Sequence, residues 1–310
     1  MFSGICVTLC AKICTGGVKP LEAKEWSAFC SLLNDKCVDP AALYGWEQGD
    51  FIKNLGVPAD YAARLFSLVS REPEIRGKII EYARLGIRAV TCEDGDFSSK
   101  LKHMLGATCP PVLFCAGDTA LFKEKLAGYV GSREANKDDL AFARFCVKQT
   151  AQRGYGVVSG GARGVDSACE DEGLDLGCKV VEFPADGMIK RLKNPKTDCA
   201  VKSGQMLMAS LAPPEGGFNL GFALMRNRYI YVCSDGTVVI RSDFNKGGTW
   251  SGATDCLKHG WCKLLCRRRA AYEGNTALIA RGAVPVDISF NGDISAATGP
   301  ENPEQLTLFK

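Results

Sequence analysis

The sequence lacks features that several large classes of protein require. No stretch approaches the roughly 20 apolar residues that a membrane-spanning helix needs. The apolar run at residues 1–11 has no basic residue before it and is interrupted by Gly4, so we expect the start of a helix there and not a signal peptide. Apolar residues make up 46% of the 310 positions and charged residues 24%, which excludes a wholly disordered chain. We expect a cytoplasmic protein without a membrane partner.

Two common nucleotide-binding motifs are also missing. The chain has no Gly-x-x-x-x-Gly-Lys-Ser/Thr loop, and no Gly-x-Gly-x-x-Gly follows the first strand of the expected parallel sheet. Histidine is scarce, and His103 and His259 lie outside the glycine-rich turns described below. Ser132 and Ser159 in those turns therefore have no base to activate them, which argues against nucleophilic catalysis.

Cysteine is abundant, with 16 residues, but its pattern fits neither disulfides nor metal. A disulfide framework is typical of short secreted chains, and the chain has no C-x-x-C pair of the kind that binds zinc. Cys6, Cys10 and Cys14 recur every four residues, and Cys262 and Cys266 repeat that spacing. This pattern favours small buried apolar side chains on one helix face. An iron–sulfur or zinc site at the first triplet is the alternative, although we expect no metal.

The net charge of +3 identifies no partner, but its distribution is uneven. Residues 21–75 hold nine acids and five bases, a balance of −4, so the remainder carries about +7. A polyanionic partner would therefore meet the later part of the chain.

The first 80 residues predict helices only. The apolar positions of residues 21–33 fit one helical face. Asp39 is suited to cap a helix that starts at Pro40, and Pro58 begins a third helix. The acidic balance favours a docking or spacer role for this region over binding to a DNA backbone.

From residue 81 short apolar runs alternate with glycine-rich turns and helices, which predicts βαβ units. The expected strands are residues 87–91, 112–115, 126–130, 155–159, 179–183, 205–209, 237–241, 263–266 and 283–286. We expect an α/β fold with a doubly wound, mainly parallel sheet. Its domains would be a helical N-terminal domain (1–80), a sheet domain (81–290) and a flexible tail (291–310). An apolar patch at 306–309 in the tail would pack back or bind a partner.

Three glycine-rich turns follow strands of this sheet and open helices. Ligands of such sheets lie beyond the carboxyl ends of the strands, where helix N-termini attract anions. The glycines let the backbone approach an anion closely, and arginine adds a fork of donors. The turns supply the candidate phosphate-binding residues Gly131, Ser132 and Arg133, then Ser159, Gly160, Gly161, Arg163 and Gly164, and then Lys246, Gly247, Gly248 and Thr249.

Basic residues and aromatic residues alternate near these turns. Arg226, Asn227 and Arg228 precede Tyr229, and Trp250 follows the third turn. Further basic clusters lie at residues 190–196 and 258–269. Single-stranded nucleic acid needs such a combination, because phosphates bind Lys and Arg while bases stack on rings. We consider Trp250 and Tyr229 as stacking residues; the alternative for Trp250 is packing of its helix against the sheet.

These motifs, taken together, resemble the DprA/Smf family of DNA-processing proteins over residues 18–286. The matching pieces occur in the family's order: 86–94, 110–117, 130–133, 159–166, 226–228 and 274–283. The element Ser-Gly-x-Ala-Arg-Gly-x-Asp at 159–166 is the most specific of them. Glu170 departs from the family, which usually has histidine at this position.

The resemblance implies a Rossmann-like core that binds single-stranded DNA and uses no cofactor. It further implies a homodimer that protects incoming strands and delivers them to the RecA recombinase during natural transformation. Arg133, Arg163 and the 226–228 run match the family's phosphate-contacting edge.

Two other functions remain open at the level of sequence. A nucleotide-processing phosphoribohydrolase would use the same cleft, but the carboxylate that such enzymes carry at the third turn is missing here. A nucleotide-sensing module, for example in phage defence, would bind a small phosphorylated ligand in that cleft. We expect a binding protein and not an enzyme.

Overall fold

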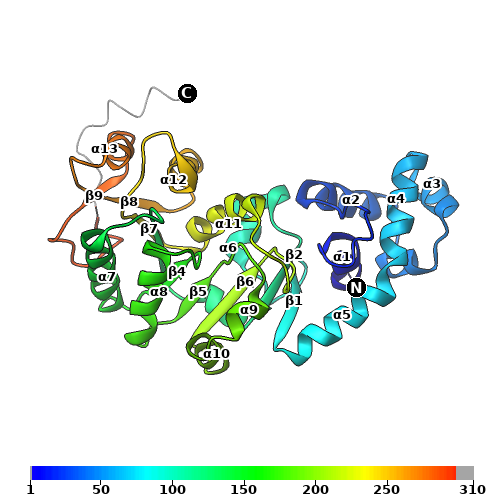
Figure 1. The fold of residues 1–310 in the computed structure, drawn as a ribbon. Helices are drawn as coiled ribbons and strands as arrows, with labels where there is room; N and C mark the ends of the chain where they lie inside the picture. The colour runs from blue at the N-terminus through cyan, green and yellow to red at the C-terminus, as the bar shows by residue number, and fades with distance from the viewer. Residues whose placement is uncertain (1, 298–310) are drawn as a thin grey trace.

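The computed structural model describes residues 2–297, which form a nine-stranded sheet flanked by helices, with further helices beyond one edge (Figure 1). Within this range every helix is too short or too polar to span a lipid bilayer. Most of the expected tail, including its apolar patch at 306–309, lies outside the described residues. Of the part that is described, Ile294 is buried beside Gly236 at the start of a strand.

The N-terminal helices lie beyond strand β1 (Figure 1). They are α1 (Phe2–Cys10), α2 (Ala23–Asp35), the 3-10 helix η1 (Pro40–Gly45), α3 (Gln48–Leu55), α4 (Ala59–Ser70) and α5 (Glu72–Arg84). Asp39 caps η1 by accepting a hydrogen bond from the backbone of Ala41. The sequence did not reveal α3, and the domain limit expected at residue 80 falls inside α5. The buried residues of these helices join those of the sheet in one continuous core.

The sheet is mainly parallel, as expected. Its strands are β1 (Ile87–Thr91), β2 (Val112–Ala116), β3 (Leu126–Val130), β4 (Gly156–Ser159), β5 (Val180–Glu182), β6 (Met206–Ser210), β7 (Gly236–Val239), β8 (Lys263–Arg267) and β9 (Val284–Val286). Their order is β1-β2-β6-β5-β4-β3-β7-β8-β9. Only β1–β2 and β2–β6 pair antiparallel. From β3 the chain builds the sheet outward in one direction as far as β6, then crosses back to add β7 on the other side, so the order reverses between β3 and β7.

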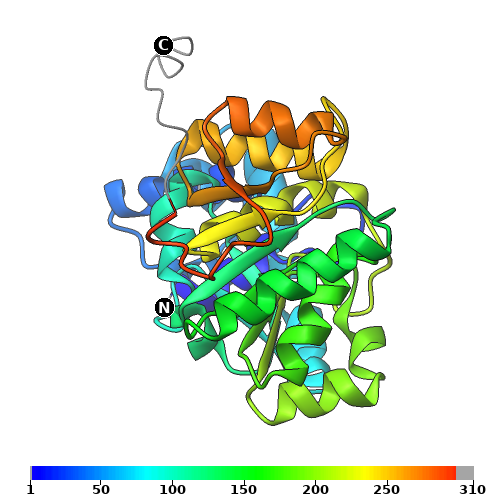
Figure 2. The same cartoon turned by 90° about the vertical axis from the view of Figure 1, so that its left-hand side faces the viewer.

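Helices cover both faces of the sheet, which explains why its strands are apolar on both sides. Figures 1 and 2 show α11, α12 and α13 on one face and α7, α8 and α10 on the other. The helices of this part are α6 (Ser99–Leu105), α7 (Lys137–Ala151), α8 (Val165–Asp175), α9 (Met188–Leu192), α10 (Pro195–Lys202), α11 (Leu220–Cys233), α12 (Gly247–His259) and α13 (Glu273–Ala280). Short 3-10 helices lie at η2 (Gly106–Thr108) and η3 (Thr119–Lys123).

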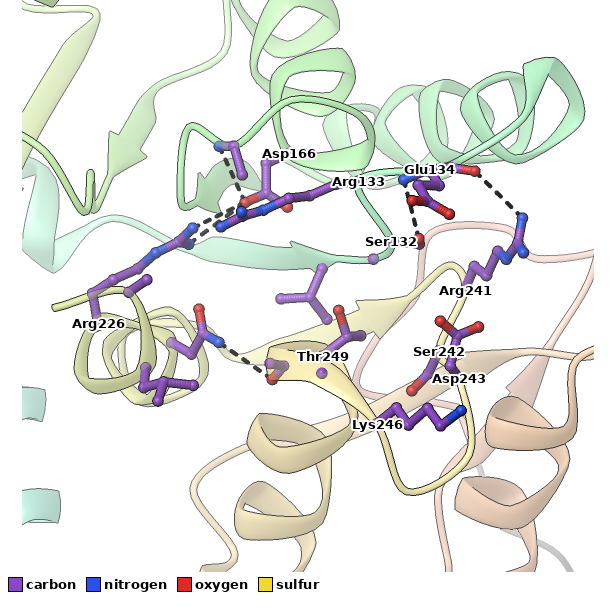
Figure 3. Close-up of a pocket in the computed structure, with 18 of the residues that line it drawn as sticks. Ser132, Arg133, Glu134, Asp166, Arg226, Arg241, Ser242, Asp243, Lys246 and Thr249 are labelled. Carbon is purple, nitrogen blue, oxygen red and sulfur yellow. Dashed lines mark hydrogen bonds and ion pairs between the residues drawn. The ribbon is translucent and has the colours of Figure 1, made fainter. Parts of the chain in front are cut away.

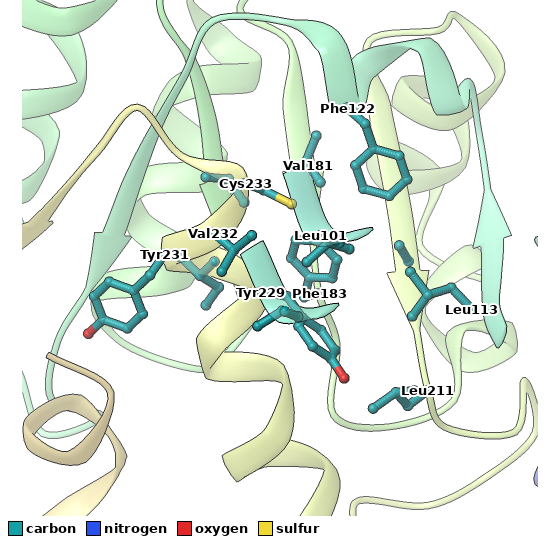
Figure 4. Packing of buried hydrophobic residues seen from close by; sticks show 14 of the residues in the cluster. Leu101, Leu113, Phe122, Val181, Phe183, Leu211, Tyr229, Tyr231, Val232 and Cys233 are labelled. Atoms are coloured by element: carbon teal, nitrogen blue, oxygen red, sulfur yellow. The ribbon is translucent and has the colours of Figure 1, made fainter. Parts of the chain in front are cut away.

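The aromatic residues after Arg228 belong to the core and not to a surface. We expected Tyr229 to stack on bases, but it lies in α11, is only 2% exposed and packs edge-on against Phe183 with ring centroids 5.7 Å apart (Figure 4). Tyr231 on the same helix is buried as well. Burial in a helix–sheet interface therefore removes Tyr229 from the candidate stacking residues.

Candidate functional site

A cleft of about 400 Å³ opens at the carboxyl ends of β3 and β7, where the strand order reverses (Figure 3). This is the position at which open α/β sheets bind ligands. The first and third glycine-rich turns line it, together with Ala162 of the second turn, the first turn of α8 and one side of α11. Of the candidate residues, the cleft brings together Gly131, Ser132, Arg133, Arg226, Asn227, Lys246, Gly247, Gly248 and Thr249.

The first turn places an exposed arginine on the wall of the cleft. The backbone N–H of Ser132 donates to the Arg241 carbonyl over 3.1 Å, which ties the end of β3 to the segment after β7. The Ser132 hydroxyl accepts from the backbone of Glu134. A Cβ on Gly131 would lie 2.5 Å from a methyl group of Val165, so this glycine serves close packing against α8. The side chain of Arg133 therefore extends from a turn that is held by the Arg241 carbonyl on one side and by Val165 on the other.

The side chain of Arg226 occupies the space inside the second turn. The Arg226 guanidinium reaches from α11 to the turn, and a Cβ on Gly160 would lie 1.1 Å from its Nη1. It pairs with the buried carboxylate of Asp166 at 3.5 Å. Ser159 is fully buried and donates its hydroxyl proton to the Tyr129 carbonyl. Gly160 and Ser159 therefore support the fold, and their predicted contact with phosphate is wrong.

Carboxylates occupy the backbone donors that we expected an anion to use. The Gly161 N–H donates to Glu170 Oε1 over 2.8 Å, and the Ala162 N–H points to Asp166 at 3.4 Å. Glu182 and Arg191 lie on the other side of Gly161, where a Cβ would be 2.1 Å from Glu182 Oε1. Arg191 pairs with both Glu182 and Asp186. The second turn is thus an internal carboxylate–arginine cluster and not an open anion cradle.

This cluster raises the pKa of its acids. Burial is the main cause for Glu170, followed by the negative charges of Glu182 and Asp166, and its pKa lies well above the ordinary value. Burial also raises the pKa of Glu182, against the opposing effect of Arg191. Asp166 is raised by burial too, against the positive charge of Arg226. Each of these acids therefore retains its proton to a higher pH in the folded protein than it would in water.

We expect the pH dependence of stability to report this cluster. An acid whose pKa is higher in the folded protein than in the unfolded chain binds its proton preferentially in the folded state, so the free energy of unfolding falls as the pH rises above the unfolded pKa. Glu170→Gln keeps an acceptor for the Gly161 N–H but carries no charge. Urea denaturation between about pH 4.5 and 8 should show a more stable variant near neutral pH, with a weaker pH dependence than the parent. A parent and variant with parallel profiles would contradict the raised pKa.

The third turn leaves a helix N-terminus open to the cleft. Lys246 precedes α12 and no side chain caps the helix, so its first N–H groups face the cleft together with Gly247, Gly248 and Thr249. The Gly248 carbonyl accepts a hydrogen bond from the Asn227 side chain, which fixes α12 against α11. By contrast, Asn136 and Asp139 cap the N-terminus of α7 with their own side chains. The α12 terminus is therefore the turn suited to an anion.

Two of the four bases that line the cleft already have carboxylate partners. Arg226 pairs with Asp166, and Arg241 lies 3.5 Å from Asp139. Arg133 and Lys246 are exposed and make no ion pair with any residue between 2 and 297. These two side chains and the α12 N-terminus form what we call the anion-binding edge.

Three candidate residues lie elsewhere than expected. Arg163 is exposed two residues before α8 but is not part of the cleft lining. Gly164 follows it, and a Cβ there would lie 2.8 Å from the Ser132 carbonyl oxygen, so this glycine serves close packing. Arg228 is half-buried on α11 and lies outside the lining too. Trp250 is buried, with its ring 5.0 Å from Phe244 and the Arg281 guanidinium over it. Packing of α12, the alternative for Trp250, is therefore correct, and base stacking by it is wrong.

The sequence did not reveal the apolar rim of the cleft. Phe218 is 58% exposed, and the Arg133 guanidinium lies 5.3 Å from its ring centroid. Leu220 and Leu224 on α11 are also exposed and line the cleft. An exposed ring beside an unpaired arginine is the arrangement that we had expected of Trp250. The signal in the sequence is a lone aromatic residue after Gly216-Gly217, in a loop and outside any apolar run.

The expected basic cluster at 258–269 is largely neutralised by ion pairs. Arg267 bonds to Asp138 and Asp139 at 2.7 Å each, and Arg269 also pairs with Asp138. Arg268 lies 3.8 Å from Asp287. These arginines connect elements of the fold, so the later part of the chain offers fewer free cations than its composition suggests.

Comparison with known proteins identifies the relatives of this chain. The family described as DNA recombination-mediator protein A matches residues 88–292. DNA processing protein DprA of Bacillus subtilis (strain 168) is 25% identical over 190 residues, which are 61% of this chain and 63% of that protein. The match thus spans a little under two thirds of the relative's own length.

Two solved structures share the fold. The X-ray structure of DprA from Streptococcus pneumoniae superposes with a TM-score of 0.64 and 18% identity, covering 86% of this chain and 95% of that one. DNA processing protein A from Helicobacter pylori, whose single-stranded DNA binding mode was the subject of its structure, gives a TM-score of 0.53 and 21% identity, covering 65% and 92%. At these identities the likeness establishes the Rossmann-like architecture.

Proposed function

Because this chain belongs to the DNA recombination-mediator protein A family, a family of DNA processing in recombination and transformation, we propose that it binds single-stranded DNA at the anion-binding edge. The observation that carries the proposal is the meeting of an uncapped helix N-terminus with Arg133 and Lys246 in one cleft. Backbone phosphate would lie between these donors, because each contact then pairs a negative oxygen with a positive partner.

The apolar rim gives bases a place beside the phosphate. Phe218 exposes more than half of its surface next to Arg133, and Leu220 continues the apolar face along α11. An aromatic face accepts any base by stacking, which is worth about 1–3 kcal/mol per base and requires no particular sequence. We propose Phe218 for the role that the buried Tyr229 and Trp250 do not fill.

The salt dependence of binding tests the proposal. About three phosphate contacts, with a slope of about 0.7 for each single-strand contact, should lower the affinity for oligo-dT by about twentyfold when salt rises fourfold. Fluorescence anisotropy of a labelled oligo-dT, measured across a salt series, gives this slope. An affinity that does not change with salt would rule out a phosphate-contacting edge.

A small nucleotide is the competing ligand, since the cleft lies at the reversal point where such sheets bind nucleotides. A competition experiment separates the two. If oligo-dT is displaced only by excess mononucleotide and raises the melting temperature further than the mononucleotide does, the strand is the ligand. If the mononucleotide stabilises the protein more, the site is a nucleotide sensor.

The remaining roles rest on the resemblance. We propose that the protein acts in the cytoplasm as a homodimer, binds without a cofactor or a catalytic step, and passes the strand to the RecA recombinase. Size-exclusion chromatography with light scattering tests the dimer. Assembly of RecA on oligo-dT coated with single-strand-binding protein, with and without this chain, tests the delivery step.

A further inference from the structure

Two cysteine thiols lie in contact on the side of α12 away from the anion-binding edge. Cys256 belongs to the last turns of α12, and Cys262 lies just before β8. Their sulfur atoms are 3.7 Å apart. Cys256 is fully buried, whereas Cys262 is partly exposed to solvent. Cys262 is thus the more exposed residue of the pair, and the Cys256 sulfur is in contact with the Cys262 sulfur.

Cys262 is the acceptor of a small hydrogen-bond network. The Ser234 and Thr237 hydroxyls each lie 3.4 Å from its sulfur and 2.7 Å from one another. The Ser234 hydroxyl also lies 3.0 Å from the Tyr231 carbonyl. The Cys256 thiol lies 3.7 Å from the Cys262 sulfur and 3.5 Å from the Cys262 carbonyl. The Cys262 sulfur is therefore surrounded by three groups that can each donate a hydrogen bond to it.

The pKa values of the two thiols are displaced in opposite directions. The hydrogen bond from Cys256 is the main cause that lowers the pKa of Cys262, with Ser234 and Thr237 acting in the same sense against burial. The hydrogen bond to Cys262 and burial raise the pKa of Cys256. These shifts favour the thiolate at Cys262 and the protonated thiol at Cys256, the division found in redox-active dithiols.

We propose that Cys262 and Cys256 form a redox-active dithiol that peroxides oxidise to a disulfide. The Cys262 thiolate attacks one oxygen of hydrogen peroxide, the O–O bond breaks, and the departing hydroxide takes up a proton to leave as water. The product is a sulfenic acid at Cys262. The Cys256 sulfur then attacks the Cys262 sulfur, the S–OH bond breaks, and the hydroxide leaves as water with the Cys256 proton. Two thiols lose two electrons in total, and one peroxide becomes two waters.

Four other cysteines show that exposure alone or burial alone does not create this environment. Cys37 and Cys199 are exposed, and neither thiol has a hydrogen-bond partner among residues 2–297. Cys146 and Cys115 are buried, and burial raises their pKa. Exposure alone or burial alone does not prepare a sulfur for oxidation. Cys262 combines partial exposure, hydroxyl donors and a second sulfur in contact.

Mass spectrometry after brief treatment with hydrogen peroxide tests the pair. Peptide mapping of the intact protein should reveal a Cys256–Cys262 disulfide, with the loss of two hydrogen masses, while Cys199 is still reduced. Cys262 should also react with iodoacetamide faster than Cys199, since a lowered pKa raises the fraction of thiolate.

Two variants assign the roles of the sulfurs. Cys256→Ser removes the second sulfur, so the Cys262 sulfenic acid should persist and be trapped by dimedone. Cys262→Ser should leave Cys256 reduced at the same peroxide dose, and Cys199→Ser is the control that should behave like the parent. The proposal is overturned if the parent protein forms no Cys256–Cys262 disulfide, or if Cys37 and Cys199 are oxidised before Cys262.

Discussion

Replacing both Arg133 and Lys246 by alanine should lower the affinity for oligo-dT by about a hundredfold or more, since each charge-assisted contact contributes about 1.5–3 kcal/mol. The melting temperature should hardly change, because both side chains are exposed and make no ion pair within residues 2–297. The salt slope should fall with each charge removed, because each neutralised phosphate releases counterions. Anisotropy titrations of the single and double variants at several salt concentrations measure both effects.

A matched control removes the same charge from the opposite edge of the sheet. Lys123 and Lys179 are exposed and lie just before the amino ends of β3 and β5. Lys123→Ala/Lys179→Ala should therefore bind oligo-dT nearly as the parent does. Equal losses in the two double variants would mean that net charge alone drives binding and would remove the anion-binding edge from the site. Arg133→Lys should bind oligo-dT more tightly than Arg133→Ala but more weakly than the parent, because an ammonium group does not form the forked contact.

Much of the fold could be predicted because its signals are local. The strand at residues 126–130 has the limits that we expected from its apolar run before a glycine turn. The strand at residues 87–91 also has the expected limits. The remaining strands differ from expectation by one or two residues at their ends, where hydrogen bonding decides the limit and composition does not. Helix α3 was missed because its segment is short and has few apolar positions.

The errors in the site come from contacts between distant residues. Tyr229 and Tyr231 are two residues apart, a spacing typical of a strand. The buried face of the helix that actually forms is harder to recognise, because the charged Arg226 interrupts its apolar positions. Arg226 is tolerated on the buried face only because Asp166, 60 residues away in sequence, lies opposite. Likewise, no local sequence pattern indicates that the Glu170 carboxylate accepts the hydrogen bond of the Gly161 N–H. The strand–turn–helix order located the edge of the sheet at which the cleft opens, but tertiary contacts decided which donors are free.

Arg267 holds two elements of the fold together. Its guanidinium reaches from β8 to the start of α7, where it bonds to Asp139 and Asp138 at 2.7 Å each. It also lies 4.5 Å from the Phe142 ring centroid. Asp139 is fully buried, accepts a hydrogen bond from the Tyr272 hydroxyl and belongs to the cap of α7. Removing the arginine would leave a buried carboxylate without its main partner.

Arg267→Met should therefore lower the free energy of unfolding by about 3–5 kcal/mol, the typical cost of removing one partner of a buried ion pair. Urea denaturation measures this loss. Adding Asp139→Asn removes the buried charge that has lost its partner, so the double variant should regain part of the stability. The double-mutant cycle then gives the coupling free energy between the two residues. Below the unfolding transition, Arg267→Met should bind oligo-dT with nearly the affinity of the parent, because Arg267 does not line the cleft. Loss of DNA affinity with unchanged stability would instead make the basic run at 258–269 part of the binding surface and Arg267 a ligand contact.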